Sequence, residues 1–521
     1  MARVLITEEL APSANAALAA AGHDVDVQLG LSPEELRAAV KGADALIVRS
    51  ATKVTEDVFE ACDRMIVVGR AGVGIDNIDL AAATAHGVMV VNAPQSNIVS
   101  AAEHTIAMLL AQARNIPQAH AALVAGRWER SRWEGVEISG KTLGVLGLGR
   151  IGALVAQRAS AFGMRVVAYD PFVAPERAKQ MGVELLTIDE LAGQADFVTV
   201  HVVKTPDTIG LVGESFFAKA KRGVRIVNVG RGGIVDEAAL AKAIEAGQVG
   251  GAALDVFAEE PTTESPLFAL PNVVVTPHLG ASTAEAQDKA GEQIAEQVVL
   301  ALAGEFVPYA VNVNAAAASE TVRPFVPLAE RLGHLLAGLV GTLPGALEVE
   351  YRGPIADFDV SLATLSALRG VLGASTHEPV SFVNAPSLAS ERGLETKEIK
   401  VASAHDEVSF VTLRGNDRSV SGTLAGISGE PRIVAIDGIS CEVPPAKHLC
   451  VVRNDDRVGM LALVTSAMAE ANVNIADAHL GRAADGSAAL IVLATDAEVS
   501  GDVVERLRSS AGILDARSLS A

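Results

Sequence analysis

The fold of the centre of this chain follows from residues 142–152, which read TLGVLGLGRIG. An apolar strand runs into a G-x-G-x-x-G turn, and a helical pattern follows from Ala153 to Ala161. A second apolar strand then ends in Asp170, 18 residues after Gly152. Strand, glycine turn, helix, strand and acid in this order are typical of a dinucleotide-binding unit.

Each glycine of this turn has its own predicted role. Gly147 permits the tight turn, Gly149 lets the backbone approach a pyrophosphate, and Gly152 lets the helix pack closely on the strand. The unpaired N–H groups of the helix N-terminus would face the phosphates. Asp170 can accept hydrogen bonds from both hydroxyls of a ribose and would repel a 2′-phosphate, so the pattern favours NAD over NADP.

The composition indicates a globular chain of about three or four domains. The chain has 521 residues, half of them hydrophobic and 20% charged. No apolar run approaches the roughly 20 uncharged residues of a membrane helix, and residues 1–7 read as a strand rather than a signal peptide. Three scattered cysteines are too few for a disulfide scaffold or a zinc site. We therefore expect a cytoplasmic protein without a membrane partner or a metal.

The formal charge of −21 comes from 42 basic and 63 acidic residues. Such an acidic surface argues against a nucleic-acid partner. An anionic substrate would need a local basic cluster, because the overall field would repel it.

Two α/β regions are expected before residue 314. Short strands alternate with helical segments in residues 3–95, and this alternation predicts a parallel sheet. Its predicted strands are Val4–Thr7, Ala45–Val48, Met65–Val68 and Val88–Val91. A helix over Ser100–Arg114 precedes a second series with six strands, at 142–146, 166–169, 197–201, 225–229, 251–255 and 273–276. This second series fits a doubly wound, Rossmann-type nucleotide domain.

The segments around these regions complete the predicted domains. Residues 115–140 read as irregular, and we interpret Trp128 and Trp133, with their neighbouring arginines, as a surface arm that packs on a partner subunit. The helix Thr283–Leu302 is expected to return to the first domain. The predicted boundaries are 1–97 with 284–314 for a discontinuous, flavodoxin-like substrate domain and 98–283 for the nucleotide domain.

Beyond a linker near residues 311–319, the pattern changes to α+β. Two helices, 324–340 and 362–372, precede predicted strands at 398–402, 408–413, 420–425 and 432–436. Residues 319–444 are expected to form this intervening domain. Residues 447–521 read as βαββαβ, which predicts a small ferredoxin-like module.

Four candidate chemical groups follow strand ends of the nucleotide domain: Arg231, Asp255, Glu260 and His278. The carboxyl ends of parallel strands form the ligand-binding edge of such a sheet. Histidine can remove or return the proton of an alcohol, and a neighbouring carboxylate orients its ring. An arginine can hold a carboxylate with two hydrogen bonds. Together these groups suit hydride transfer at a hydroxyl-bearing carbon, without a catalytic metal.

Other candidates are weaker. The glycines of residues 72–74 imitate a second fingerprint, but Asn77 replaces the third glycine, so this loop is assigned to the substrate side. His104 and His201 are interpreted as packing or neighbouring contacts rather than acid/base groups. Arg49 and Arg70 also follow strand ends, and they indicate either a doubly anionic ligand or ordinary surface charge.

Arg231, Glu260 and His278, with the fingerprint and Asp170, resemble the D-isomer-specific 2-hydroxyacid dehydrogenases. Within this family, residues 48–52 (VRSAT), 70–77 (RAGVGIDN), 91–94 (VNAP) and 278–283 (HLGAST) look like the D-3-phosphoglycerate dehydrogenase branch. Its long form adds an intervening regulatory domain and a C-terminal ACT domain, which match the lengths seen here.

The resemblance implies roles for individual residues. His278 would be the acid/base and Glu260 its partner, while Arg231 would bind the substrate carboxylate. Arg49 and Arg70 would meet a phosphate, with Asn97 a further substrate candidate. Contacts with NAD are implied for Gly147, Gly149, Arg150, Ile151, Gly152, Asp170, Val229, Gly230, Asp255, Gly280 and Ala281. An amino-acid effector would bind Asn454, Asp456 and Asn474 at a subunit interface.

The resemblance also implies the reaction, which is NAD-dependent oxidation of 3-phospho-D-glycerate in serine biosynthesis. L-serine feedback stays open, because Val458 stands where the family usually has proline. A glyoxylate/hydroxypyruvate reductase, or another D-2-hydroxyacid dehydrogenase, is the first alternative. A non-catalytic NAD-sensing protein is the second. The arm and the ACT-like module both indicate a homotetramer.

Overall fold

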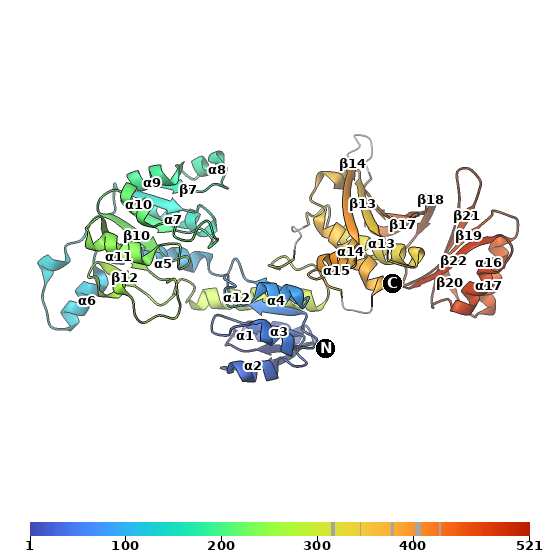
Figure 1. The fold of residues 1–521 in the computed structure, drawn as a ribbon, viewed down its shortest axis with the longest axis horizontal. Coiled ribbons are helices and arrows are strands. Elements are labelled where there is room, and N and C mark those ends of the chain that lie inside the picture. The colour runs from blue at the N-terminus through green and yellow to red at the C-terminus, as the bar shows by residue number, and fades with distance from the viewer. Residues whose placement is uncertain (314–317, 344, 377–379, 402–407, 427–428, 521) are drawn as a thin grey trace.

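The computed structural model describes residues 1–313, 318–343, 345–376, 380–401, 408–426 and 429–520. Four sheets follow one another along the chain, two of them parallel and two largely antiparallel. Figure 1 shows the nucleotide domain at one end of an elongated molecule and the βαββαβ module at the other. The predicted fold class is confirmed. Residues 314–317 of the expected linker lie outside the described residues.

The first sheet has the strand order β2-β1-β3-β4-β5, and its strand pairs are all parallel. This order is flavodoxin-like. The strands are β1 (Arg3–Ile6), β2 (Asp24–Val27), β3 (Ala45–Val48), β4 (Val67–Arg70) and β5 (Met89–Asn92). Edge strand β2 was not predicted, because half of its residues are aspartate and none is buried.

Helices α1 (Pro12–Ala20), α2 (Pro33–Ala39), α3 (Glu56–Ala61) and α4 (Leu80–Ala85) cover the first sheet. A later helix, α12 (Ala284–Leu302), packs against α1 and β4. The approach is close because Gly69 of β4 leaves room for Ile294, where a Cβ would lie only 2.8 Å away. Segments from the two ends of this region of the sequence therefore share one hydrophobic core.

The second sheet is the doubly wound sheet, with order β12-β11-β10-β9-β6-β7-β8 and parallel pairing throughout. Its strands are β6 (Thr142–Leu146), β7 (Arg165–Tyr169), β8 (Glu184–Leu185), β9 (Phe197–Val200), β10 (Val224–Asn228), β11 (Val249–Leu254) and β12 (Val273–Val275). The strand order reverses between β6 and β9, which is where dinucleotides bind in such folds. Only the two-residue strand β8 was not predicted, since so short a segment carries no periodic signal.

Helices α5 (Ile98–Ala113), α7 (Arg150–Ala161), α8 (Pro175–Gln180), α9 (Ile188–Gln194), α10 (Glu214–Lys219) and α11 (Glu237–Glu245) flank this sheet. The expectation of an irregular segment at 115–140 was partly wrong. Ile116–Val124 forms α6, because Pro117 starts a helix well and alanines continue it. This arm lies at the outer edge of the domain in Figure 1, and Trp128 is 82% exposed.

The third sheet has the order β14-β13-β15-β16-β17-β18. Its strands are β13 (Ala346–Arg352), β14 (Glu395–Val401), β15 (Phe410–Gly415), β16 (Arg418–Ala425), β17 (Glu430–Ile436) and β18 (Ile439–Val443). Helices α13 (Phe325–Val340), α14 (Ser361–Ser375) and α15 (Ala385–Glu391) accompany them. Ala402 of the first predicted strand is outside the described residues, and β13 and β18 were not predicted.

The last sheet has the order β20-β21-β19-β22 and is antiparallel. It is built from β19 (His448–Asn454), α16 (Met460–Glu470), β20 (Ile475–Arg482), β21 (Ala489–Thr495), α17 (Gly501–Arg508) and β22 (Ile513–Ser520). The βαββαβ order is the one predicted for a ferredoxin-like module.

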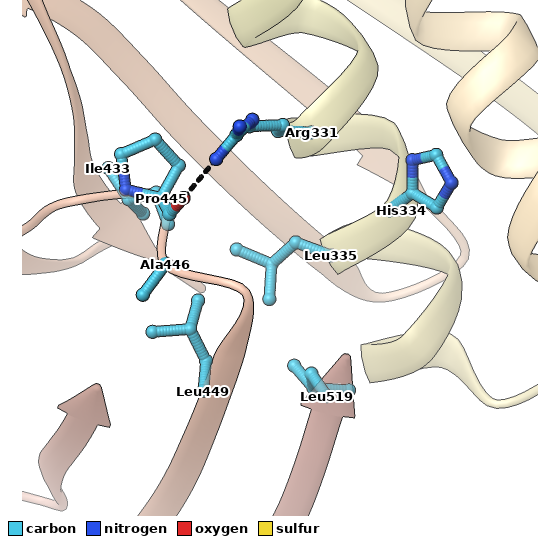
Figure 2. A pocket seen from close by; sticks show the side chains of 8 residues that line it. All are labelled: Arg331, His334, Leu335, Ile433, Pro445, Ala446, Leu449 and Leu519. Atoms are coloured by element: carbon cyan, nitrogen blue, oxygen red, sulfur yellow. Dashed lines mark hydrogen bonds between the residues drawn. The ribbon is translucent and has the colours of Figure 1, made fainter. Parts of the chain in front are cut away.

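The third and fourth sheets share one hydrophobic core at their joint. Figure 2 shows Arg331 of α13 donating a hydrogen bond to the carbonyl of Pro445, above an apolar group that includes Leu335, Leu449 and Leu519. The cavity among these side chains is about 20 Å³, room for a single water molecule. One hydrophobic core therefore extends across both modules.

Candidate active site

The glycine turn leads from β6 into α7. Gly147 has φ +93°, and a Cβ on it would press on the backbone of His201. A Cβ on Gly152 would overlap the carbonyl of Gly147, so only glycine lets α7 pack this closely. Apart from its chain neighbours, no atom of the described residues lies within 4 Å of a Cβ built on Gly149, which precedes α7. The turn is thus tight on one side and open on the side of the helix N-terminus, as a pyrophosphate requires.

Asp170 lies just after β7 and faces this turn. Its Oδ2 accepts a hydrogen bond from the N–H of Leu148 at 2.7 Å, and its Oδ1 accepts one from the N–H of Phe172 at 2.9 Å. A carboxylate has about four acceptor positions, so two remain for ribose hydroxyls. The side chains of the neighbouring cofactor candidates differ in exposure, since Arg150 is exposed whereas Ile151 is half-buried.

His278 and Glu260 form a direct pair. His278 Nδ1 lies 2.6 Å from Glu260 Oε2, and Glu260 Oε1 accepts a hydrogen bond from the N–H of Phe257. Burial raises the pKa of the Glu260 carboxyl, but these hydrogen bonds outweigh burial and hold the pKa below its usual value. An ionised carboxylate accepts only, so His278 must carry its proton on Nδ1. Its Nε2 is then available as a base.

Arg231 follows β10 in a loop that packs on the Glu260 loop. A Cβ on Gly232 would overlap the carbonyl of Phe257, so glycine at this position allows the two loops to touch. The Arg231 side chain is 30% exposed, and its Nε lies 3.5 Å from Asp76 Oδ2. Because Asp76 belongs to the loop after β4, this ion pair connects the two parallel-sheet domains.

Asp255 is fully buried at the end of β11 and holds the loop that contains His278. Its Oδ1 accepts hydrogen bonds from Thr276 Oγ1 at 2.6 Å and from the N–H of Leu279 at 2.7 Å, while its Oδ2 accepts one from the N–H of Gly280 at 2.8 Å. Burial raises the pKa of Asp255, but the hydrogen bonds, including one from His104, outweigh it and lower the pKa. A contact with a nicotinamide carboxamide stays a prediction for Asp255.

The remaining cofactor candidates lie around this loop. A Cβ on Gly280 would lie 3.0 Å from the side chain of Val229 and 3.2 Å from Asp255 Oδ2, so the loop packs closely on the end of β10. Val229 is buried, and Gly230 donates a backbone hydrogen bond to Asn228 Oδ1. Ala281 is half-buried beside them.

Arg49 and Arg70 belong to the first domain. Arg70 is the last residue of β4, and partial burial, with repulsion from Arg231, lowers its pKa to about 10. Arg70 therefore stays protonated at neutral pH, and its Nε is buried without a hydrogen-bond partner among the described residues. Arg49 lies close enough to lower the pKa of Arg70 slightly. Three guanidinium groups thus gather in one region of an otherwise acidic protein.

Sequence reasoning missed Glu8, which supports this basic cluster. Its carboxylate accepts hydrogen bonds from the N–H groups of Arg49, Ala51 and Thr52 at 2.8–3.2 Å. Burial raises the pKa of Glu8, but these hydrogen bonds outweigh it and lower the pKa. No local motif marks this role, because Glu8 follows a different strand from the loop that it fixes.

The substrate-side loop and Asn97 are the remaining substrate candidates. A Cβ built on Gly74 would press on the guanidinium of Arg231, and one built on Gly72 would press on that of Arg70, so residues 72–74 lie beside the basic cluster. Asn97 precedes α5, and its Oδ1 is buried without a partner among the described residues. Asn77, the residue that breaks the second fingerprint, instead donates to the carbonyls of Arg49 and Thr52.

His104 and His201, which we interpreted as packing or neighbouring contacts, lie in different surroundings. Burial lowers the pKa of His201 to about 4, so His201 is neutral at pH 7 and bonds to Thr199. His104 lies at the site itself, with Nε2 at 3.2 Å from Thr276 Oγ1 and 3.3 Å from Asp255 Oδ1. The sequence allowed a neighbouring contact for His104 but did not indicate its partners, because Thr276 is 172 residues away.

The effector candidates lie far from this site, in the ferredoxin-like module. Asn454 is buried at the end of β19, and its Nδ2 has no partner among the described residues. Asp456 accepts a hydrogen bond from Arg482 at 3.1 Å. Asn474, beyond the other end of α16, donates to Asp496 at 2.6 Å. The N–H of Asp456 donates to Asn454 Oδ1 at 3.0 Å, so these two residues meet, whereas Asn474 lies at the other end of α16 within the same chain.

The described part of the chain offers neither a metal centre nor a membrane span. It contains no group of three or more His, Cys, Asp or Glu side chains arranged to hold a metal ion. Over the same residues, no helix combines the length and apolar character needed to cross a membrane.

Three family models match the chain. The NAD binding domain of the D-isomer specific 2-hydroxyacid dehydrogenases matches residues 106–280. The D-3-phosphoglycerate dehydrogenase intervening domain matches residues 321–437, and the ACT domain matches residues 448–512. The NAD cofactor predicted from the glycine turn and Asp170 is confirmed by the first match.

Similar proteins extend over nearly the whole chain. D-3-phosphoglycerate dehydrogenase from Mycobacterium tuberculosis (strain ATCC 25618 / H37Rv) is 51% identical over 507 residues, 96% of each chain. The protein of that name from Methanocaldococcus jannaschii is 40% identical over 519 residues, 99% of each chain.

Solved structures match the first two domains. The TT0316 protein from Thermus thermophilus has a TM-score of 0.55 and 36% identity, covering 59% of this chain and 99% of its own. D-lactate dehydrogenase from Aquifex aeolicus, complexed with NAD and lactic acid, has a TM-score of 0.52 and 27% identity. The match covers 58% of this chain and 96% of that structure's chain. With its three matching domains and its full-length relatives, the chain belongs to the D-3-phosphoglycerate dehydrogenase family.

Proposed function

We propose that this protein oxidises 3-phospho-D-glycerate to 3-phosphohydroxypyruvate with NAD, the first step of phosphorylated L-serine biosynthesis. One observation carries the proposal: the Arg231 loop packs on the loop of Glu260, the partner of His278, and Arg231 and Arg49 both lie near Arg70. A proton acceptor beside several cations suits a hydroxy acid with two anionic ends.

His278 acts as the acid/base. Its Nδ1–H donates to Glu260, which leaves Nε2 free to take the proton of the substrate hydroxyl. As that proton arrives, the ring becomes cationic, and the ionised Glu260 stabilises the charge. In the reverse direction, the same Nε2–H returns the proton to the ketone oxygen.

The described residues fit NAD at the carboxyl edge of the second sheet. The open space beside Gly149 and the N-terminus of α7 suit the pyrophosphate, and the two free acceptor positions of Asp170 suit the adenine ribose. Val229, Gly230, Asp255, Gly280 and Ala281 would line the nicotinamide end. When bound, NAD supplies the acceptor for the hydride that leaves the substrate carbon.

The arginines bind the two anionic ends of the substrate. Arg231 holds the carboxylate, because a guanidinium can donate two parallel hydrogen bonds to it. Arg70, protonated at neutral pH and with an unpartnered Nε among the described residues, binds the phosphate together with Arg49. Asn97 has a buried acceptor without a partner in the same part of the chain and suits a substrate hydroxyl.

Initial rates of NADH oxidation test this function. We expect kcat/KM for 3-phosphohydroxypyruvate to exceed that for hydroxypyruvate by roughly 100-fold, since charge-assisted hydrogen bonds contribute about 1.5–3 kcal/mol each. Equal values would favour the alternative, a glyoxylate/hydroxypyruvate reductase. NADH binding without turnover of either keto acid would instead indicate an NAD-sensing protein.

L-serine is the proposed effector of the ACT domain. Asn454 and Asp456 lie at one end of α16 and Asn474 at the other, so a complete site needs residues from two subunits. The exposed side chains of the α6 arm, Val124 and Trp128 among them, suit a second subunit contact. Two different interfaces in one chain generate a homotetramer.

The free cysteines are in keeping with the cytoplasm as the compartment of this protein.

A further inference from the structure

One face of α5 contacts the loop between β12 and α12. Ser100, His104 and Met108 are four residues apart, so their side chains lie in a row along the helix. Ser100 Oγ lies 2.8 Å from Thr283 Oγ1, at the end of the loop. His104 and Met108 both meet Thr276 Oγ1, at 3.2 Å and 3.7 Å. The loop is therefore attached to α5 at both of its ends.

His104 joins a buried hydrogen-bond network rather than the open part of the cleft. Its Nε2 lies 3.3 Å from Asp255 Oδ1, and Asp255 is fully buried. The Thr276 hydroxyl donates its proton to Asp255 at 2.6 Å, so Thr276 can only accept from His104. Both neighbours of Nε2 are thus acceptors, which requires the tautomer with the proton on Nε2.

This network controls the backbone conformation of His278. His278 has φ +55°, a left-handed conformation that residues other than glycine rarely adopt unless their surroundings hold it. The N–H of His278 donates to the Asp255 carbonyl at 2.8 Å, and the Asp255 carboxylate accepts from the next two N–H groups. A shift of Asp255 or Thr276 would therefore change where the imidazole of His278 points.

We propose that His104 is a positioning residue for the hydride-transfer site. Its Nε2–H fixes Thr276 and the Asp255 carboxylate, and these two residues hold the loop that presents His278. This inference rests on the proposed function, because one of its tests measures kcat with the proposed substrate. His104 acts through Asp255 and Thr276, and it exchanges no proton with the substrate.

The test compares two variants of His104 with a control on the same helix. His104→Gln keeps an N–H donor near the position of Nε2, whereas His104→Leu removes the donor and keeps a similar volume. Thr105→Val is the control, because Thr105 is buried on α5 and its hydroxyl donates to the carbonyl of Ala101 within the same helix. The full-length protein is measured for kcat and KM with 3-phosphohydroxypyruvate, for the dissociation constant of NADH by fluorescence, and for thermal unfolding.

We expect His104→Leu to lower kcat about 10-fold, the effect of one lost hydrogen bond, and to weaken NADH binding a few-fold with the substrate KM unchanged. His104→Gln should stay within about 3-fold of the native protein in both kcat and NADH binding, and Thr105→Val should match the native protein.

Two results would overturn the inference: native kcat and NADH binding in His104→Leu, or equal losses in the Leu and Gln variants. A native protein that binds NADH but does not turn over the phosphorylated keto acid would refute the proposed function instead. The NADH dissociation constants of the three variants would then still decide the role of His104.

Discussion

The two halves of this chain place their candidate ligand residues in different ways. In the first 313 residues, the end of β4 and the loops after β10, β11 and β12 carry the candidate residues Arg70, Arg231, Glu260 and His278. In the C-terminal module, Asp456 and Asn474 lie at opposite ends of α16, which has 11 residues and is about 16 Å long. As proposed, the catalytic site is complete within one chain, whereas the effector site needs a second chain.

Sheet topology explains the difference. All strands of a parallel sheet end at the same edge, so residues from distant parts of the sequence converge there. The last sheet is antiparallel, and its strand ends alternate between two edges. Its candidate residues can form one site only when a second chain supplies the missing side. Catalysis should therefore depend on residues of one chain, and effector binding on residues of two.

The largest effect is expected for His278→Asn. Asparagine tolerates the positive φ at this position, so the loop keeps its shape while the acid/base is lost. We expect kcat to fall by about 10²–10⁴-fold, with NADH binding nearly unchanged. Full activity in this variant would remove the proposed mechanism. Glu260→Gln, measured in parallel, should lower kcat less, because it removes only the orienting partner.

A smaller effect is expected for Asp170→Ala. The variant loses the acceptor for the ribose and the negative charge that repels a 2′-phosphate. The ratio of kcat/KM for NADH over NADPH should fall by roughly 10- to 100-fold, as charge-assisted hydrogen bonds contribute about 1.5–3 kcal/mol. Glu184→Ala, an exposed carboxylate on the adjacent strand β8, is the control. An unchanged coenzyme preference in Asp170→Ala would mean that Asp170 does not meet the ribose.

Inhibition by L-serine tests directly whether two chains share the effector site. Asp456→Ala and Asn474→Ala should each raise the half-inhibitory concentration of L-serine about 10-fold or more, with kcat unchanged. Mixed oligomers of the two variants should regain part of the inhibition, because one of the two sites between an Asp456→Ala chain and an Asn474→Ala chain combines an intact Asp456 with an intact Asn474. A mixture as insensitive as either variant alone would place both residues in a site made by a single chain.

The smallest effect concerns stability in acid. The folded-state pKa of Asp255 is lowered, so its contribution to stability is complete above the unfolded value of about 3.9 and is lost as the pH falls through the folded value. Asp255→Asn should lower the free energy of unfolding by about 1–3 kcal/mol at pH 7, and the difference from the native protein should shrink below about pH 4. The exposed Asp207→Asn is the control. A difference that does not vary with pH would contradict the ionised state of Asp255.

Much of the catalytic half could be predicted from the sequence, because its signals are local. The strand before Gly147, the glycine turn and the acid at Asp170 lie within one short βαβ unit, and Glu260 and His278 each follow a recognisable strand. The hydrogen bonds of Glu8 and His104 could not be predicted. The Glu8 carboxylate, after β1, binds a loop 41 residues away, and His104 on α5 binds a loop 172 residues away. Only the tertiary fold shows these contacts.

Strand predictions failed where strands were short or partly exposed. In β13, buried Leu347, Val349 and Tyr351 alternate with glutamates, so a period-two signal was present and could have been found. Strand β18 alternates in the same way over five residues. The two residues of β8 gave no such signal, and their pairing with β7 depends on the tertiary fold.

The most direct test of the proposed function combines Arg70 with the substrate phosphate. kcat/KM is measured for 3-phosphohydroxypyruvate and for hydroxypyruvate, in the native protein and in Arg70→Met, which keeps much of the buried side-chain volume. We predict that the variant loses roughly 10- to 150-fold on the phosphorylated substrate and less than about 3-fold on the other, since only the former has a group for Arg70 to bind. Equal losses on both substrates would contradict a phosphate site at Arg70, and with it the assignment of a phosphorylated substrate to this cleft.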